Sequence, residues 1–173
     1  MDREEFALRV SARRNQLYRT AYLYLGREAD ALEAVDETVY RALRRLKQLQ
    51  TPALFETWIT RILINACHNE LRRRKRFHPG GDDALPEPRG APGSDADDPA
   101  QSVADRAGAA ELETLVRGLR EPYGRIAVLY FLEHRETAEI AKLVGRPPAT
   151  VNSQLWRAKL LLRQQITERR QKE

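Results

Sequence analysis

An acidic segment rich in proline and glycine, residues 78–105, divides this chain of 173 residues into two halves. The segment holds seven acidic residues and one basic residue, together with five of the nine prolines and four of the nine glycines. It has almost no large apolar side chains, so it cannot bury enough surface to offset the entropy lost on ordering. We therefore expect a flexible acidic linker between two small domains, residues 1–77 and 106–173.

The charge and the cysteine content limit the classes of partner and compartment. The chain carries a net charge of +5 and has a pI of about 9.6, although the linker itself is acidic. This balance favours a polyanionic partner, either nucleic acid or an anionic membrane surface. A single cysteine, Cys67, excludes an internal disulfide and fits a reducing cytoplasm. The charged first residues and the lack of an apolar run of about 18 residues favour a cytoplasmic location.

The first half shows the apolar periodicity of three helices, expected at residues 2–25, 28–46 and 54–76. Gly26 should end the first helix, and residues 47–53 should form a loop. The predicted apolar positions of the first helix are Leu17, Tyr18, Ala21, Tyr22 and Leu25. Those of the second are Ala31, Val35, Val39, Ala42 and Leu46, and those of the third are Trp58, Ile59, Ile62, Leu63 and Ala66. A second, polar face of the third helix carries Arg61, Asn65, His68, Asn69 and Arg72.

The second half ends in a pattern typical of a helix-turn-helix, after two short helices expected near residues 106–119 and 122–132. A helix at residues 137–144, with Thr137 as its predicted N-cap, should end at Gly145. Pro148 can then begin the next helix. The predicted inward positions of the pair are Ile140, Ala141, Val144, Val151, Leu155, Ala158 and Leu162. The opposite face of the second helix carries Asn152, Ser153, Gln154, Arg157 and Lys159.

In a helix-turn-helix, the start of the second helix enters the major groove of DNA. Amide and guanidinium side chains suit this position because they can form paired hydrogen bonds with base edges. The same residues also fit an ordinary helical hairpin with a solvated face. The pattern favours DNA recognition without excluding the hairpin.

Several motifs resemble the sigma-70 family. Residues 17–22 (LYRTAY), 28–33 (EADALE), 55–65 (FETWITRILIN) and 71–73 (LRR) occur in the order and spacing of its region 2. Residues 138–141 (AEIA) and 149–159 (ATVNSQLWRAK) are similar to its region 4. A chain with only these two regions resembles the extracytoplasmic-function (ECF) sigma factors. The resemblance implies an all-α fold and a protein that binds core RNA polymerase and directs promoter-specific transcription initiation.

The resemblance also implies contacts with polymerase. Glu33, Asp36 and Glu37 match the stretch of the second helix that docks on the clamp helices of the β′ subunit. Region 4 is expected at the β flap. A negative patch on a basic domain needs a positive partner other than DNA, although a solvated helix face is the alternative interpretation of each acid. Here Leu32, Glu33 and Asp36 replace the family's usual Glu, Asp and Gln, so the acidic character is kept.

The resemblance places recognition of the melted −10 element on the loop and the third helix. Leu49 and Gln50 match the loop that captures a base, and Ile62, Leu63 and Asn65 match the helix surface beside it. Single-stranded bases are bound by capture, stacking and edge hydrogen bonds. Arg61, Arg72, Arg73 and Arg74 are expected to bind phosphates. The spacing of Trp58 with Ile62 favours a place for Trp58 in the core.

Recognition of the duplex −35 element is expected from the second helix of the helix-turn-helix. Asn152, Ser153, Gln154 and Arg157 are the candidates for base or phosphate contacts, and Lys159 and Arg163 are candidates for backbone contacts. Trp156 is expected either to pack against the sugar-phosphate surface or to cover the core. Two positions that are basic in the family are the amides Asn152 and Gln154 here, so we expect a modified −35 preference.

Three alternatives remain. Cys67, His68 and Glu70 lie close together, but there is no second His or Cys at a metal-binding spacing and no phosphate-binding glycine loop, so neither an enzyme, a cofactor nor a small-molecule substrate is expected. A stand-alone helix-turn-helix regulator would need an element for dimerisation, which is not evident. A membrane-surface protein would use the basic run 72–76, which lacks a strong apolar face. The family resemblance also implies an anti-sigma factor as a partner, often membrane-bound, released in response to a stress signal.

Overall fold

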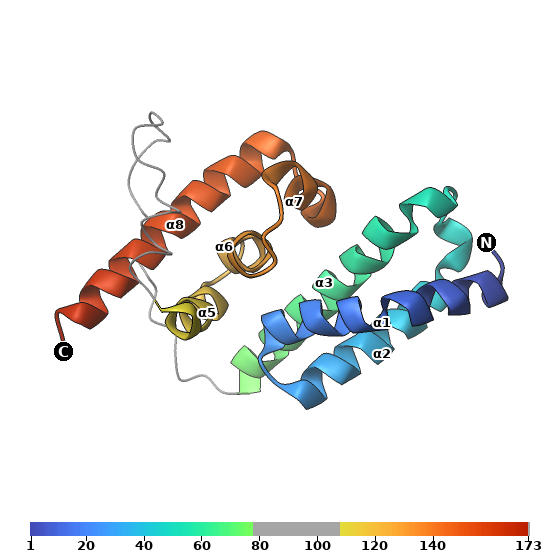
Figure 1. Cartoon of the computed structure of the whole chain (residues 1–173), viewed down its shortest axis with the longest axis horizontal. Helices are drawn as coiled ribbons and strands as arrows, with labels where there is room; N and C mark the ends of the chain where they lie inside the picture. Colours follow the sequence, from blue (N-terminus) through green and yellow to red (C-terminus); the bar gives the residue numbers. More distant parts are fainter. Residues whose placement is uncertain (78–107, 173) are drawn as a thin grey trace. The chain divides into compact units, whose positions relative to one another are not determined.

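The computed structural model describes residues 1–77 and 108–172, and these form helices with no strand among them (Figure 1). Contacts divide the chain into two compact units, one based on helices α1 to α3 and the other on the later helices. This confirms the predicted all-α fold of two small helical bundles. The predicted acidic linker, residues 78–105, lies outside the described residues, and its flexibility and the domain boundaries stay predictions.

The first unit is a bundle in which α1 (Arg3–Leu25), α2 (Glu28–Arg44) and α3 (Phe55–Phe77) all contact one another. The carboxylate of Asp2 caps α1 by accepting a hydrogen bond from the backbone N–H of Glu5 at 2.8 Å. Gly26 ends α1 with a left-handed backbone conformation (φ 69°), which lets the chain reverse within two residues. The three helices begin and end within two residues of the predicted positions.

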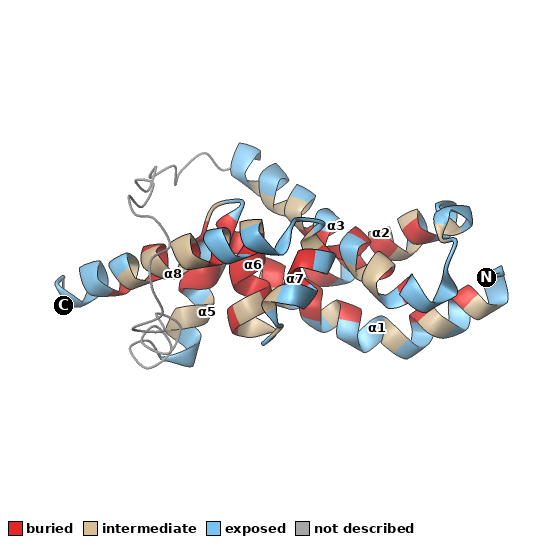
Figure 2. Cartoon of the chain, turned by 90° about the horizontal axis from the view of Figure 1, so that it is seen from above, coloured by how far each residue is buried: buried red, intermediate tan, exposed pale blue. Residues whose placement is uncertain are grey.

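The buried residues of this unit follow the predicted helical periodicity (Figure 2), although four predicted apolar positions are only half-buried: Tyr18, Val39, Leu46 and Trp58. Tyr22 was expected in the apolar face of α1 but is exposed, whereas Tyr24 is buried. Tyr24 lies seven residues after Leu17 and therefore on the same side of the helix, while Tyr22 lies further round. The core formed by α1 consists of Phe6, Val10, Leu17, Thr20, Ala21, Tyr24 and Leu25. From α2 and α3 it receives Ala31, Ala34, Val35, Thr38, Ala42, Phe55, Ile59, Ile62, Leu63, Ile64, Ala66 and Cys67.

The segment predicted as a plain loop, residues 47–53, contains two short 3₁₀ turns. The first, η1 (Leu46–Gln48), follows α2, and the second, η2 (Pro52–Leu54), leads into α3. Pro52 suits the first position of η2 because it has no N–H that would need a partner there. Only Leu49, Gln50 and Thr51 remain between the two turns, so this part of the connection is short and supported at both ends.

The second unit contains α5 (Ala109–Gly118), α6 (Tyr123–Ala127), α7 (Thr137–Val144) and α8 (Pro148–Arg170). A π-helical turn, η3 (Val128–Leu132), continues α6, so the helix predicted at residues 122–132 is present but changes its winding. Both α5 and α8 pack against α6. The core contains Leu115, Val116, Leu119, Tyr123, Ile126, Ala127, Val128, Leu129, Phe131, Ile140, Ala141, Val151, Leu155, Ala158, Leu161, Leu162 and Ile166.

The turn between α7 and α8 has the predicted form. Gly145 adopts φ 67° and ψ 38°, and its N–H donates to the carbonyl oxygen of Ala141. Pro147 is extended, and α8 begins at Pro148. The predicted N-cap Thr137 is wrong: Glu136 occupies that position, because its carbonyl already accepts the N–H of Ile140 at 2.9 Å, and it makes no side-chain cap. None of the described helices combines the length and the hydrophobicity that a membrane span requires.

Candidate functional site

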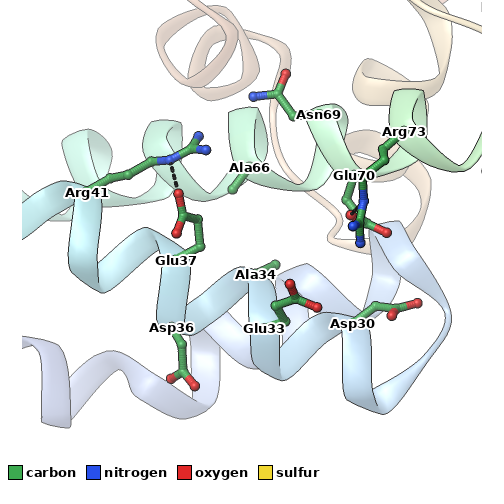
Figure 3. Close-up of a pocket in the computed structure, with 10 residues that line it drawn as sticks. All are labelled: Asp30, Glu33, Ala34, Asp36, Glu37, Arg41, Ala66, Asn69, Glu70 and Arg73. Atoms are coloured by element: carbon green, nitrogen blue, oxygen red, sulfur yellow. Dashed lines mark hydrogen bonds and ion pairs between the residues drawn. The ribbon is translucent and has the colours of Figure 1, made fainter.

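A hollow of about 520 Å³ lies between α2 and α3 of the first unit (Figure 3). Five acidic and two basic side chains line it, so the surface is negative although the chain as a whole is positive. The lining residues from α2 are Asp30, Glu33, Ala34, Asp36, Glu37 and Arg41. Those from α3 are Ala66, Asn69, Glu70 and Arg73. The three predicted polymerase-binding acids therefore share one surface, and α3 adds a wall that was not predicted.

The three predicted acids differ in their partners. Glu37 accepts a hydrogen bond from Nε of Arg41 at 2.6 Å, and Asp36 is 3.3 Å from Nη2 of Arg14 on α1. In Figure 3, Asp36 points away from α3 and Glu37 points towards Arg41. Within the described part of the chain, Glu33 makes no ion pair. Since exposed pairs contribute less than about 1 kcal/mol, Asp36 and Glu37 can exchange their present contacts for those of a basic partner, and Glu33 has no ion pair among the described residues to lose.

One end of the hollow is a network of charged residues that joins α3 to the start of α2. Nε of Arg73 donates to Glu70 at 2.8 Å, and Arg74 pairs with both Glu70 and Asp30. The hydrogen bond from Arg73, together with the positive charges of Arg73 and Arg74, lowers the pKa of Glu70, while the same hydrogen bond raises the pKa of Arg73. Arg74 also donates to the carbonyl oxygen of Leu25 at 2.9 Å.

This network gives carboxylate partners to two arginines that were expected to bind phosphates, and their phosphate contacts stay a prediction. Arg74 connects the end of α3 to the turn between α1 and α2 through Leu25 and Asp30. Arg73 lines the acidic hollow with its guanidinium on Glu70. The signal was present in the sequence, because Glu70 lies three and four residues before these arginines, a spacing that brings helical side chains together.

Apolar side chains accompany the acids on the outer face of α2. Leu32, Tyr40 and Leu43 are exposed by 42%, 56% and 40%. With Asp36 they follow one another at i, i+4, i+8 and i+11, which places all four on one side of the helix. Exposed aromatic and aliphatic side chains among charges are typical of a surface that binds another protein.

The residues predicted to bind the −10 element are only partly at the surface. Gln50 is exposed and Leu49 is half-buried, in the short stretch between η1 and η2. Arg61, Asn65 and Arg72 are exposed along α3 at i, i+4 and i+11, hence on one face. Ile62 and Leu63 are buried, with Ile62 only 8% exposed, so the prediction that they lie on the helix surface is wrong. Their side chains complete the bundle core, as their periodicity alone indicated. Trp58 is half-buried, with its ring centroid 6.3 Å from that of Phe55.

The residues predicted to bind the −35 element lie along the first half of α8. Asn152 and Ser153 are exposed, and the half-buried ones are Gln154, Trp156, Arg157 and Lys159. The inward positions of α8 are buried as predicted, so the polar face is turned away from the core. The ammonium group of Lys159 lies 4.8 Å from the ring centroid of Tyr130 on η3, a cation–π contact that the sequence did not indicate.

A second charged network lies just before the helix-turn-helix. Arg135 donates to Glu133 at 3.0 Å and pairs with Glu139 on α7. Burial by itself would lower the pKa of Arg135, but hydrogen bonds and charge from these two carboxylates outweigh it and raise the pKa. The network connects the end of η3 to the first turn of α7 and so helps to set the direction in which α7 begins.

The two units match models of known protein families. Residues 10–77 match the model of sigma-70 region 2, and residues 109–162 match the model of sigma-70 region 4. This chain belongs to the sigma-70 family. Region 2 corresponds to the unit with the acidic hollow, and region 4 to the unit with the helix-turn-helix. The first turns of α1 and the last turns of α8 lie outside the matched residues of this sigma factor.

Individual relatives agree with the predicted ECF resemblance. The chain is 25% identical to the RNA polymerase sigma factor SigV of Bacillus subtilis, over 92% of this chain and 89% of that protein. It is 29% identical to the ECF RNA polymerase sigma factor SigE of Mycolicibacterium smegmatis, over 89% of this chain and 58% of that protein. The fold resembles that of the sigma factor RpoE of Bartonella quintana, solved with the anti-sigma factor NepR, with a TM-score of 0.62 and 16% identity over 95% and 98% of the two chains.

Family membership makes this protein an RNA polymerase sigma factor that acts in transcription initiation. Its relatives are regulatory proteins rather than enzymes. Cys67, considered above together with His68 and Glu70, is fully buried in the core of the region 2 unit, as expected for a small apolar residue.

Proposed function

We propose that this sigma factor binds core RNA polymerase through α2 and directs it to promoters with two separately read elements. The −35 element is read as duplex by the first half of α8. The −10 element is read as melted strand by residues 49–51 and the polar face of α3. The observation that carries the proposal is the acidic and partly apolar face of α2 on a chain whose net charge is +5.

The charge of α2 supports a protein partner at this face. An acidic surface repels DNA, so Glu33, Asp36 and Glu37 fit a basic protein surface such as the β′ clamp helices. Leu32 and Tyr40 lie beside them and supply the apolar area that a stable contact needs. Region 4 is proposed to contact the β flap in the same complex.

The exposure of residues on α8 supports duplex recognition. Asn152 and Ser153 are exposed in the first turns, where a recognition helix meets base edges. Gln154 follows Ser153 directly, and Arg157 lies one helical turn after Ser153. The amide and guanidinium groups of these two side chains can form paired hydrogen bonds with base edges. Lys159, whose ammonium group contacts the Tyr130 ring, is proposed to contact a phosphate, because an ammonium group binds phosphate as a point charge without a defined orientation.

The short connection before α3 supports capture of a single base. Leu49 and Gln50 offer an apolar side chain and an amide at a surface held between two turns. Arg61, Asn65 and Arg72 would then follow the strand along α3. The basic end of α3 adds affinity that depends on salt but not on sequence.

An anti-sigma factor is proposed as a further partner. The solved relative RpoE was crystallised with the anti-sigma factor NepR. A protein that covers the α2 face would prevent polymerase from binding there. The sigma factor would then be inactive in the cytoplasm, or held at the membrane by its partner, until a signal releases it.

The test is run-off transcription with bacterial core polymerase on a library of promoters randomised at both elements. We expect initiation that depends on the sigma factor and selects one pair of −35 and −10 sequences. Absence of core binding, together with binding of duplex DNA as a dimer, would contradict the proposal and favour the stand-alone helix-turn-helix regulator.

A further inference from the structure

The N-terminal turns of α1 hold the segment that follows the proposed base-capturing residues. Nη1 of Arg9 donates to the carbonyl oxygen of Pro52 in η2 at 2.9 Å. The same guanidinium lies 5.8 Å from the ring centroid of Phe55, and its Nη2 donates to Glu5 at 2.7 Å. One side chain of α1 therefore contacts both η2 and the first residue of α3, more than forty residues away in sequence.

A buried aromatic pair lies beside Arg9 and joins the same two helices. Phe6 and Phe55 are 3% and 1% exposed and pack edge to face, with 6.0 Å between their ring centroids. One turn further along α1, Arg13 pairs with Glu56. Because Phe55 and Glu56 begin α3, the start of this helix is fixed to α1 by three adjacent side chains.

The carbonyl oxygen of Pro52 links α1 to the connection between α2 and α3. It accepts the N–H of Phe55 within η2 as well as the guanidinium of Arg9, so both of its lone pairs are used. On the other side, η1 is continuous with the end of α2. Leu49, Gln50 and Thr51 therefore connect η1, which is supported by α2, to η2, which is held by Arg9.

We propose that Arg9 is a positioning residue for recognition of the −10 element: it sets the geometry of residues 49–51 by fixing Pro52 to α1. This inference rests on the proposed function, because it assigns Arg9 a role in base capture by that loop. Arg9 precedes the residues that match sigma-70 region 2, which begin at residue 10. It acts through Pro52 and does not itself contact DNA.

The chemistry of Arg9 suits this role better than that of a general surface cation. A planar guanidinium can donate to two acceptors while it stacks on a ring, whereas an ammonium group offers no flat face. Loss of Arg9 should leave α1, α2 and α3 packed through their apolar faces, because Phe6 and Phe55 remain. It should loosen η2 and thereby the residues before it.

The experiment compares four full-length proteins with core polymerase on the randomised promoter library: wild type, Arg9→Ala, Arg9→Lys and Arg19→Ala. Arg19→Ala is the matched control, since Arg19 is an exposed arginine of the same helix and makes no hydrogen bond or ion pair among the described residues. Core affinity and thermal unfolding are measured for each protein. Base preference is then read separately at every position of both elements.

For Arg9→Ala we expect the −35 preference and the core affinity of wild type, with about tenfold weaker discrimination at the −10 position that the loop captures. Arg9→Lys should restore part of the discrimination, and Arg19→Ala should resemble wild type. A wild-type −10 preference in Arg9→Ala would overturn the proposal. An equal loss of transcription on every promoter sequence would also overturn it, because a purely structural role predicts that result.

Hydrogen exchange of the full-length protein tests the anchor without transcription. We expect the amides of Leu49 and Leu54, which donate within η1 and η2, to exchange about tenfold faster in Arg9→Ala while amides of α2 keep their rates. Unchanged exchange rates at both amides would contradict the proposal that Arg9 holds η2 in place. If the wild-type protein failed to initiate transcription on any promoter, both the proposed function and the role of Arg9 in base capture would be contradicted. The hydrogen-exchange rates would still show whether Arg9 holds η2 in place. If Arg9→Ala did not fold, Arg9→Gln would replace it in both measurements.

Discussion

Gly124 lies in α6 at a point of close backbone contact. It is buried, and a Cβ atom at this position would overlap with the carbonyl oxygen of Leu119. A backbone oxygen cannot move aside as the end of a flexible side chain can, so Gly124→Ala requires a shift between α6 and the segment that follows α5. We expect the free energy of unfolding of the region 4 unit to fall by about 1–3 kcal/mol, as measured by urea denaturation.

Gly118→Ala is the matched control for that substitution. Gly118 is the last residue of α5, and a Cβ atom there would have no heavy atom within 4 Å. We expect unchanged stability or a gain of up to about 1 kcal/mol, because alanine favours the helix and restricts the unfolded chain. Equal destabilisation by both substitutions would show that the contact with Leu119 is not the cause.

Glu70 gives the region 2 unit a defined dependence on pH. Its pKa lies below the ordinary value of 4.5, chiefly because Arg73 donates a hydrogen bond to it. A carboxyl group whose pKa is lowered by folding stabilises the protein above the unfolded pKa, and this contribution is lost as the pH falls through the folded pKa. We therefore expect Glu70→Gln to lower stability at pH 7, by up to about 1 kcal/mol.

The measurement for Glu70→Gln is thermal unfolding between pH 7 and pH 2. The difference from wild type should shrink as the pH falls below the ordinary value of 4.5, because wild-type Glu70 also becomes protonated. Glu4→Gln, which removes an exposed carboxylate at the start of α1, should leave the stability close to that of wild type. A constant difference across the whole range would show that Glu70 acts through packing rather than charge.

At the scale of elements, α3 illustrates how one helix serves several purposes. One face, including Ile62 and Leu63, belongs to the core of the bundle. A second face lines the acidic hollow with Asn69 and Glu70, and a third carries Arg61. The helical repeat of 3.6 residues separates these faces, so a change on one of them can leave the others intact.

The recognition helix α8 allows base reading to be separated from phosphate binding. We expect Gln154→Ala to relax discrimination at one position of the −35 element, at a cost of about 1–3 kcal/mol for the preferred base. We expect Arg163→Ala to weaken binding almost equally for all sequences and to lower the salt slope by about one. Binding of duplex −35 libraries at several salt concentrations measures both effects. A uniform loss of affinity in Gln154→Ala would contradict a base contact.

At the scale of the whole molecule, the separation of charge predicts that polymerase binding and DNA binding can be altered independently. Glu33 makes no ion pair among the residues that the structure describes, so Glu33→Lys changes the α2 face without breaking an internal contact. We expect the binding free energy for core polymerase to weaken by roughly 1–4 kcal/mol, because the new lysine would face the basic surface of polymerase that is proposed to bind α2. Binding of duplex DNA should stay the same or increase.

Glu4→Lys controls for the change in net charge, since Glu4 is an exposed acid of α1 that does not line the hollow. Core affinity can be measured for both variants by competition with the wild-type sigma factor. Equal effects of Glu33→Lys and Glu4→Lys would indicate that net charge, rather than the α2 face, controls polymerase binding.

The sequence by itself determined the helices, their division between two units and the helix-turn-helix. These features depend on local signals: apolar side chains repeat every three to four residues, Gly26 and Gly145 permit left-handed turns, and Pro148 can begin a helix. The motifs that resemble regions 2 and 4 were equally local, and for that reason the family could be recognised before the fold was known.

Only the tertiary structure decided how side chains far apart in sequence meet. The sequence shows that Ile62 is apolar and that Arg74 is charged. Only the packing of α3 against α1 and α2 shows that Ile62 is buried and that Arg74 pairs with Asp30. The contact of Arg9 with Pro52 spans 43 residues and depends on how α1 and α3 are rotated against each other. A local repeat carries no information about that rotation, because it is set by the fit of all the buried side chains together.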